Sequence, residues 1–136
     1  MVNLTLRKRT IEWLLKEEGF RSKPYKCTEG VLTFGHGLTY ITEEESLNIV
    51  KKRVEEIISK LPAVLGDTAL DDFRKAILVD MCFQLGIKGV CSFKGMLAAL
   101  AKGDYETAAQ EMLNSKWHVQ TPVRCEKLAE RMRKGC

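Results

Sequence analysis

Apolar residues recur at helical spacing over most of the chain, interrupted by one glycine-rich stretch near the beginning. Spacing of three and four residues marks the buried face of an amphipathic helix. The expected helices span about residues 5–18, 42–61, 69–85, 93–101 and 104–114, with a last helix from Pro122 that ends at Gly135. The pattern therefore predicts a mostly helical protein.

Cap and turn residues mark the ends of these helices. Thr42 and Glu45 form a capping box, in which each side chain bonds the other residue's backbone N–H. Pro62 is expected to end the helix that starts there, because proline interrupts helical hydrogen bonding. The remaining boundaries are marked by Gly19, Asp104, Thr121 with Pro122, and Gly135.

Residues 23–40 do not follow the helical pattern. They are rich in Tyr, Val, Thr and Phe and are punctuated by glycines, which favours a small antiparallel hairpin or meander. Its expected turn is residues 28–30. Gly35 and Gly37 indicate a bulge, or a close approach of the backbone to the sheet or to a ligand. The expected fold class is α+β, mostly helical, with one small antiparallel sheet near the N-terminus.

Glu18 occupies an unusual position in the first expected helix. The apolar stripe of that helix includes Ile11, Leu14 and Leu15, and Glu18 is the next position on it. Burial and the negative end of the helix would both disfavour the charged carboxylate and raise its pKa. An inward carboxylate is costly unless it has a task, so Glu18 is a candidate functional residue.

The helix expected over 69–85 is apolar on nearly all sides, which is typical of a central, buried helix. Cys82 on it is interpreted as a small buried thiol. The exceptions are Asp80 and Gln84, which are four residues apart and share a face. They either face a polar cleft or are hydrogen-bonded within the core, and the sequence leaves both open.

Length and composition favour one well-packed domain. The chain has 136 residues, is 45% hydrophobic and carries a formal net charge of +4. We expect no nucleic-acid partner, and no stable membrane insertion, because no run approaches the roughly 20 apolar residues of a transmembrane helix. No signal peptide is evident at the start, so synthesis in the cytoplasm is expected.

Five cysteines lack paired spacing and are interpreted as free thiols: Cys27, Cys82, Cys91, Cys125 and Cys136. A zinc site that uses some of them with His36 or His118 is disfavoured, so neither a metal nor another cofactor is expected. Basic residues are most frequent in the last expected helix. They indicate either a solvated face or attraction to an anionic partner.

Three reactive side chains follow one another at fixed offsets: Glu18, Cys27 after eight residues, and Thr33 after five more. A helix end followed by a hairpin holds such groups across a gap, as a hydrolytic site requires. Cys27 would act as a thiolate nucleophile, as a charge stabiliser or as a thiol that positions water, and these alternatives remain open. The hydroxyl of Thr33 suits the holding of a water molecule.

Three separated segments resemble the phage-type lysozymes, or endolysin muramidases. The first runs from Glu18 to Gly35, the second is Phe83-Gln84-Leu85-Gly86, and the third is residues 117–124, which end in Thr121-Pro122-Val123-Arg124. They occur in the family's order and cover most of the chain. The resemblance implies an endolysin that cleaves the β-1,4 bond between N-acetylmuramic acid and N-acetylglucosamine in peptidoglycan and lyses the host.

The resemblance also implies an arrangement and a site. A single domain over 1–136 would comprise a small sheet lobe over about 20–41, a linking helix over about 42–61, and a helical lobe of 1–19 with 62–136. Glu18, Cys27 and Thr33 would be catalytic, and Phe83, Gln84 and Arg124 would line the cleft. A monomer is expected, located in the host cytoplasm until it is released across the inner membrane.

The chain departs from the family pattern at several points. Cys27 stands where many members have Asp, and the region before Phe83 is short, so the small lobe should be reduced. His36 lies between the two glycines and not after the second, so no role is transferred to it. Two other classes are weighed: a cysteine peptidase or amidase using Cys27 and His36, and a non-catalytic wall-binding module. The first is disfavoured because Cys27 lies at a hairpin turn and not at a helix N-terminus, and no orienting third residue is evident. The second leaves the inward Glu18 without a role.

Overall fold

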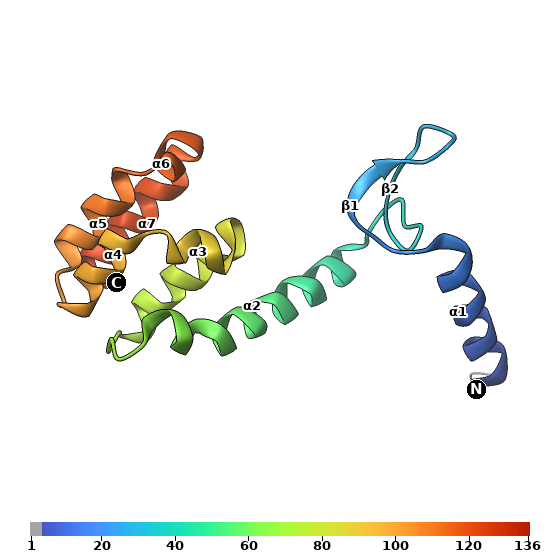
Figure 1. The fold of residues 1–136 in the computed structure, drawn as a ribbon, viewed down its shortest axis with the longest axis horizontal. Coiled ribbons are helices and arrows are strands. Elements are labelled where there is room, and N and C mark those ends of the chain that lie inside the picture. The colour runs from blue at the N-terminus through green and yellow to red at the C-terminus, as the bar shows by residue number, and fades with distance from the viewer. Residues whose placement is uncertain (1–3) are drawn as a thin grey trace. The chain divides into compact units, whose positions relative to one another are not determined.

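The structure is a computed structural model that describes residues 4–136. Its described part contains seven helices and one two-stranded antiparallel sheet near the N-terminus, which confirms the predicted fold class. The helices and strands follow in the order α1 (Leu4–Glu18), β1 (Arg21–Lys26), β2 (Leu32–Gly35), α2 (Glu43–Leu65), α3 (Asp72–Cys91), α4 (Lys94–Ala101), α5 (Tyr105–Leu113), α6 (Lys116–Gln120) and α7 (Pro122–Lys134) (Figure 1). They form two compact units, Met1–Asn48 and Ile49–Cys136.

The first unit contains α1 and the β1–β2 hairpin. The turn is where the sequence predicts it: the amide of Gly30 donates to the carbonyl of Cys27 at 2.9 Å, and Gly30 has a φ of 78°. Tyr25 pairs with Thr33 and Arg21 with Gly35, so three residues of β1 oppose one residue of β2 between these pairs. Pro24 lies in this bulge, where its missing N–H costs no ladder hydrogen bond.

Helix α1 has no buried residue in the described part of the chain. Its apolar stripe is half-exposed, since Ile11 is 40% exposed and Leu14 and Leu15 are each 48% exposed. Within the first unit the hairpin therefore leaves the predicted inward face of α1 uncovered, and Glu18 at the end of the helix is exposed. Two strands of six and four residues offer too little apolar surface to bury a 15-residue helix.

Helix α2 starts as predicted but continues past its expected end. The capping box is present, with Thr42 N–H donating to Glu45 at 2.8 Å and Glu45 N–H to Thr42 at 3.2 Å. The prediction that Pro62 ends the helix is wrong: α2 runs to Leu65 and stops at Gly66, which has a φ of 57°. Leu61 is buried, and packing of the last turn against the core outweighs the hydrogen bond that proline removes.

Helix α3 is the central helix of the second unit, as its apolar pattern predicts. Ile77, Leu78, Met81 and Cys82 on it are buried. The helix begins later than expected because Asp71 is its N-cap and accepts from the Arg74 amide at 3.0 Å. It also extends beyond Leu85 to Cys91, through a kink at Gly86 with φ 80° and ψ 162°. That backbone geometry favours glycine.

Helix α5 packs against α4, α6 and α7, and α7 also packs against α6 and α3 (Figure 1). Their best-buried side chains include Met96, Leu100, Met112, Trp117 and Met132. The predicted N-cap Asp104 is confirmed, since its side chain accepts from the Thr107 amide at 3.1 Å. The short helix α6 was not predicted from the sequence. Among the described helices none alone is long and apolar enough to cross a bilayer; α3 and α4 pass that test only jointly, across a bend of 93°.

Candidate active site

The base of the hairpin holds the end of α1 against the loop that follows β2. Arg21 pairs with Gly35, and the rings of Phe20 and His36 lie 5.2 Å apart between their centroids. The carboxylate of Glu18 then contacts the backbone at Gly37. Three successive contacts thus connect a helix terminus to a loop almost twenty residues away, and they present the Glu18 carboxylate at the exposed end of the hairpin.

Cys27 lies at the opposite end of the hairpin, where β1 enters its turn. The thiol is half-buried, and the Cys27 amide donates to the carbonyl of Val31 at 2.9 Å. Hydrogen bonds from the backbone of Glu29 and then of Val31, together with one from the Thr33 side chain, lower the pKa of Cys27 below its ordinary value. These donors stabilise the thiolate, so the turn supplies the electrostatic help that a nucleophilic or anionic Cys27 needs.

Thr33 is the only polar residue that is buried in the described part of the chain, with 5% of its surface exposed. It pairs with Tyr25 across the sheet, and its hydroxyl donates to the carbonyl of Val31 at 3.1 Å. The hydroxyl has one proton, so the hydrogen bond by which it lowers the pKa of Cys27 forms when that proton turns from the Val31 carbonyl to the thiolate. The structure therefore brings Thr33 and Cys27 together.

The other three predicted site residues lie in the second unit, on α3 and α7. Gln84 accepts a hydrogen bond from Trp117 Nε1 at 3.0 Å and donates to the Thr121 hydroxyl at 3.3 Å. Arg124 donates to Asp80 through Nε at 3.0 Å and through Nη2 at 2.5 Å. Asp80 and Gln84 are thus both hydrogen-bonded to side chains, but neither residue is buried in the core. The side chains of Asp80 and Arg124 are 39% and 42% exposed. Phe83 keeps 40% of its surface exposed.

Sequence reasoning missed several of these partners. The Asp80–Arg124 ion pair, the Trp117–Gln84 hydrogen bond and the Glu18–Gly37 contact join residues at least 19 positions apart. The sequence offered one indication of these contacts, since Trp117, Thr121 and Arg124 belong to one of the three segments that resemble the family. Thr121 itself precedes α7 as predicted, but its hydroxyl donates back to the Trp117 carbonyl at 3.3 Å instead of capping the helix.

No cluster of three or more His, Cys, Asp or Glu side chains in residues 4–136 has the geometry to hold a metal ion. The predicted catalytic residues are one carboxylic acid, one thiol with a lowered pKa and one hydroxyl, which lie on a helix end and a hairpin. A site of the hydrolytic class uses groups of these types, because an acid protonates a leaving group and a second group assists the reacting carbon. The structure brings Cys27 and Thr33 together, and it places Glu18 at the other end of the hairpin.

Comparison with known proteins agrees with this class. The family model described as phage lysozyme matches residues 15–134, which is most of the chain and includes all six predicted site residues. The chain therefore belongs to the phage lysozyme family. It is a muramidase-type glycoside hydrolase, and its family implies peptidoglycan as the substrate.

Two relatives cover most of this chain. A probable T4-type lysozyme 1 of Dictyostelium discoideum is 29% identical over 154 residues, which spans 88% of this chain and 91% of the relative. The pre-baseplate central spike protein Gp5 of Enterobacteria phage T4 is 27% identical over 86% of this chain, which corresponds to 26% of Gp5. A probable T4-type lysozyme 2 of Dictyostelium discoideum is 39% identical over 43% of this chain and 35% of its own length.

Proposed function

We propose that this lysozyme is an endolysin, which hydrolyses the β-1,4 bond between N-acetylmuramic acid and N-acetylglucosamine and thereby lyses the host cell. The observation that carries the proposal is the hairpin itself. It presents the Glu18 carboxylate at its base and a Cys27 thiol with a lowered pKa at its turn, within a chain of the phage lysozyme family.

Glu18 is the general acid in this proposal. It donates a proton to the glycosidic oxygen as that bond breaks, and an oxocarbenium-like carbon develops on the neighbouring sugar. Its exposure leaves the carboxyl group accessible to a polymeric substrate. Cys27 acts as the second group of the pair, since its thiolate either attacks or electrostatically stabilises that carbon.

Thr33 supports Cys27 from the interior of the hairpin. Its buried hydroxyl contributes to the lowered pKa of the thiol, and its remaining lone pair is available to a water molecule. In the second unit, Phe83 offers an exposed aromatic face, while Gln84 and Arg124 are held by fixed hydrogen bonds. These three residues are proposed to contact the substrate.

The proposed partner is the glycan strand of peptidoglycan, acted on by a monomer. The proposed site of accumulation is the cytoplasm of the host bacterium, with action on the wall after release across the inner membrane. The family membership supports the substrate, while the location and the monomeric state follow from the endolysin role.

Product chemistry tests the proposed function. Purified peptidoglycan digested by the enzyme should release new reducing sugar ends, and reduction followed by hydrolysis should identify them as muramic acid. New amino groups without reducing ends would instead indicate an amidase or peptidase that uses Cys27. Binding to walls with neither product would indicate a wall-binding module and would contradict the proposal.

A further inference from the structure

The side chain of Glu18 occupies the place where any residue other than glycine at position 37 would put its Cβ. A Cβ built on Gly37 would lie 2.5 Å from the Glu18 carboxyl carbon Cδ and 2.9 Å from Cγ. Real Cβ atoms essentially never approach other heavy atoms closer than 3.0 Å. Gly37 also has a φ of 72°, in the left-handed region that favours glycine.

Among the other left-handed glycines of the described residues, Gly135 alone is similarly crowded, by the Arg74 guanidinium at 2.8 Å in the second unit. Gly35 meets only the side chain of Leu38, at an ordinary 3.4 Å. Several have no heavy atom within 4 Å of an added Cβ: Gly19, Gly30, Gly66, Gly86 and Gly103. Backbone conformation alone therefore explains those glycines, whereas position 37 has a second requirement, which is room for the Glu18 carboxylate.

The loop that carries Gly37 is held in place from both sides. Phe34 and Leu38 exchange two backbone hydrogen bonds, at 2.8 and 2.9 Å, so residues 35–37 form a closed turn. The ring contact between His36 and Phe20 attaches that turn to the residues just after Glu18. A side chain at position 37 would thus displace the more mobile partner, which is the exposed Glu18 side chain.

We propose that Gly37 is a positioning residue for Glu18, because its bare backbone forms the surface that sets where the carboxylate lies. The inference rests on the proposed role of Glu18 as the general acid. Proton donation requires the acid within hydrogen-bonding reach of the glycosidic oxygen. A misplacement of about 1 Å costs roughly 100-fold in rate. Gly37→Ala is accordingly expected to lower kcat about 10- to 100-fold and to change KM little.

The matched control is Gly103→Ala in the α4–α5 connection. Gly103 has a φ of 69°, close to the 72° of Gly37, but has no neighbour within 4 Å of an added Cβ. Both variants introduce the same backbone strain, so Tm should fall by about 4 °C in each from strain alone. Only Gly37→Ala should fall further, and only Gly37→Ala should lose activity per folded molecule.

Two double-mutant cycles separate positioning from strain. In a Glu18→Ala background the extra loss of Tm caused by Gly37→Ala should disappear, because the colliding side chain is gone. In a Glu18→Asp background, whose carboxylate is one methylene shorter, the loss of kcat caused by Gly37→Ala should be at least threefold smaller. These cycles are measured with the full chain, by thermal denaturation and by reducing-end release from peptidoglycan.

Each outcome decides one question. Additive Tm changes in the first cycle would show that the two residues do not interact and would overturn the inference. Coupled Tm changes with a fully active Gly37→Ala would leave a steric contact without a positioning role, which also overturns it. Near-normal activity of Glu18→Gln would instead contradict the proposed function, while the coupled Tm changes would persist.

Discussion

At the residue scale, the proposed chemistry uses two acidic groups at opposite ends of the hairpin, Glu18 and Cys27. The Glu18 carboxylate lies exposed against the Gly37 backbone, where a substrate can reach it. The Cys27 thiol lies in a turn whose donors lower its pKa. A family position that often carries an aspartate is thus occupied by a thiol whose surroundings favour the anion.

Glu18→Gln should abolish most of the activity without unfolding the protein. The amide keeps the size of the carboxylic acid but has no proton to donate, and general acid catalysis contributes on the order of 10²–10⁴-fold. Reducing-end release should fall by that factor while Tm changes by less than about 3 °C, because the side chain is exposed. Wall lysis near the original rate would remove Glu18 from the mechanism.

Cys27→Asp should retain substantial activity, whereas Cys27→Ser and Cys27→Ala should lose most of it. The aspartate is anionic and similarly short, and neither serine nor alanine ionises near neutral pH. In the unsubstituted enzyme, iodoacetamide should modify Cys27 before Cys82 and Cys125, since burial raises the pKa of each of the latter to about 11. Mass spectrometry of digested samples measures both the site and the rate.

The alkylation rate of Cys27 should rise with pH through a midpoint below the ordinary value for a thiol, because the turn lowers its pKa. A bound wall fragment should slow the reaction if the thiol faces the substrate. If Cys27→Ala were folded and fully active, Cys27 would have only a packing role, and Glu18 and Thr33 would be the remaining catalytic residues.

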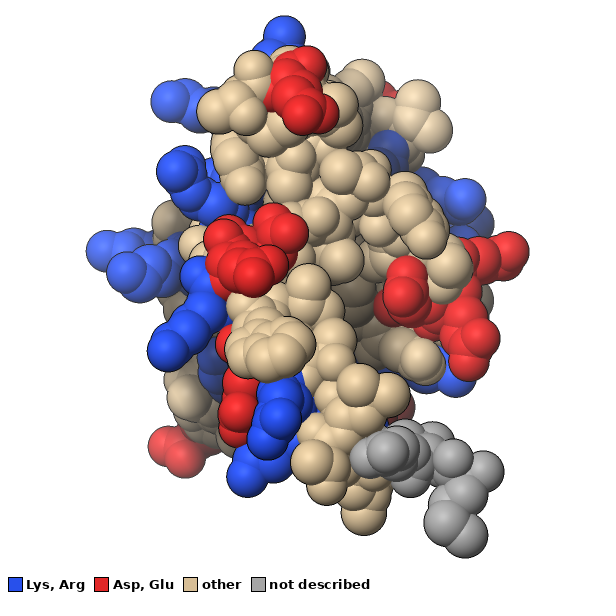
Figure 2. Space-filling view, turned by 90° about the vertical axis from the view of Figure 1, so that its right-hand side faces the viewer, with Lys and Arg blue, Asp and Glu red and all other residues tan. Residues whose placement is uncertain are grey.

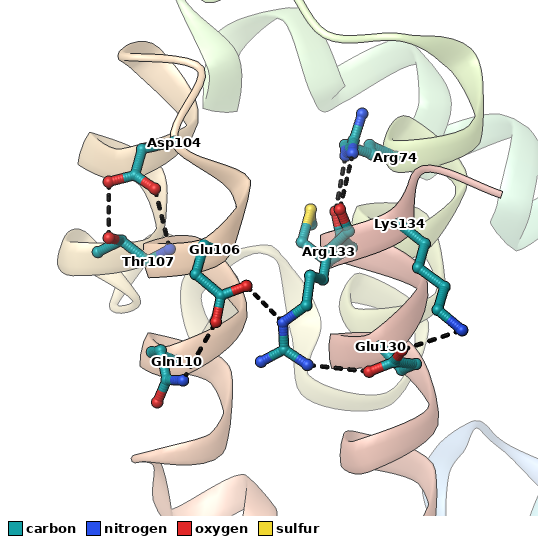
Figure 3. Close-up of polar contacts among 9 residues, drawn as sticks. Arg74, Asp104, Glu106, Thr107, Gln110, Glu130, Arg133 and Lys134 are labelled. Atoms are coloured by element: carbon teal, nitrogen blue, oxygen red, sulfur yellow. Dashed lines mark hydrogen bonds and ion pairs between the residues drawn. The ribbon is translucent and has the colours of Figure 1, made fainter.

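At the scale of helices and strands, the second unit is held together where three helix ends meet. Arg74 near the start of α3 donates through Nε to the Met132 carbonyl at 2.7 Å and through Nη2 to the Arg133 carbonyl at 3.3 Å, both in the last turn of α7 (Figure 3). Its guanidinium also lies 3.4 Å from the centroid of the Tyr105 ring at the start of α5. A cation at a helix C-terminus is favourable.

Arg74→Ala should destabilise the protein by about 2–4 kcal/mol, since charged hydrogen bonds and a cation–π contact are lost from a side chain only 11% exposed. Arg74→Lys should recover less than half of that lost stability, because an ammonium lacks the planar, forked arrangement of N–H donors of a guanidinium. Arg131→Ala changes an exposed cation on α7 and is the control, with an expected effect within about 0.5 kcal/mol. Urea denaturation measures the free energy of unfolding of all three variants. Equal losses in Arg74→Ala and Arg131→Ala would contradict the role of Arg74.

Two buried thiols make the core sensitive to alkaline pH. Burial raises the pKa of Cys82 on α3 and of Cys125 on α7 to about 11. In the unfolded chain a thiol has a pKa of about 8.5. Between that pH and about 11 the unfolded chain therefore binds fewer protons than the folded one. Stability contributed by the protonated thiols is therefore fully present below about pH 8.5 and is lost as pH rises to about 11.

Cys125→Ala should reduce the fall in Tm between pH 8.5 and 10.5, although it lowers Tm at pH 7 by removing a packed side chain. Cys136→Ala, which changes an exposed thiol, is the control and should leave the slope unchanged. An unchanged slope in Cys125→Ala would mean that other groups dominate the alkaline transition.

At the scale of the whole molecule, 22 Lys and Arg residues stand against 18 Asp and Glu residues. The net charge is +4, and the face drawn in Figure 2 carries basic and acidic side chains interspersed with uncharged surface. On α7, Arg133 pairs with Glu106 at 2.6 Å and with Glu130 at 2.9 Å, and Lys134 pairs with Glu130 (Figure 3). Lys127 and Arg131 on the same helix are exposed.

A doubly neutralised variant, Lys127→Gln with Arg131→Gln, should lyse whole cells more slowly at low salt and nearly normally at 0.3 M salt. Attraction between exposed cations and an anionic envelope is screened over a Debye length of about 10 Å at 0.1 M. Arg133→Gln should instead lower Tm, because it breaks two ion pairs on the surface. Clearance of turbid cell suspensions at several salt concentrations measures the lysis rate of the double variant. A loss of lysis rate that is independent of salt would argue for a structural role of Lys127 and Arg131.

Most of the local structure could be predicted from the sequence, because its causes lie within a few residues. The capping box at Thr42, the N-cap Asp104, the hairpin turn and the spacing of Glu18, Cys27 and Thr33 all depend on neighbours along the chain. The apolar pattern of α3 likewise identified the central helix. Three matched segments identified the family before any contact was known.

Only the tertiary structure decided the rest, since those outcomes depend on residues far apart in the chain. Pro62 would end the helix if the lost backbone hydrogen bond were not offset by the packing of Leu61 against the core. Helix propensity describes single residues and gives no information on that packing. The hydrogen-bond partners of Arg124 and Gln84, and those of Arg74 on α7, lie 33–59 positions away. The space left for Glu18 beside Gly37 exists because the hairpin folds the chain back on itself, which brings a helix end against a turn that only a glycine fits.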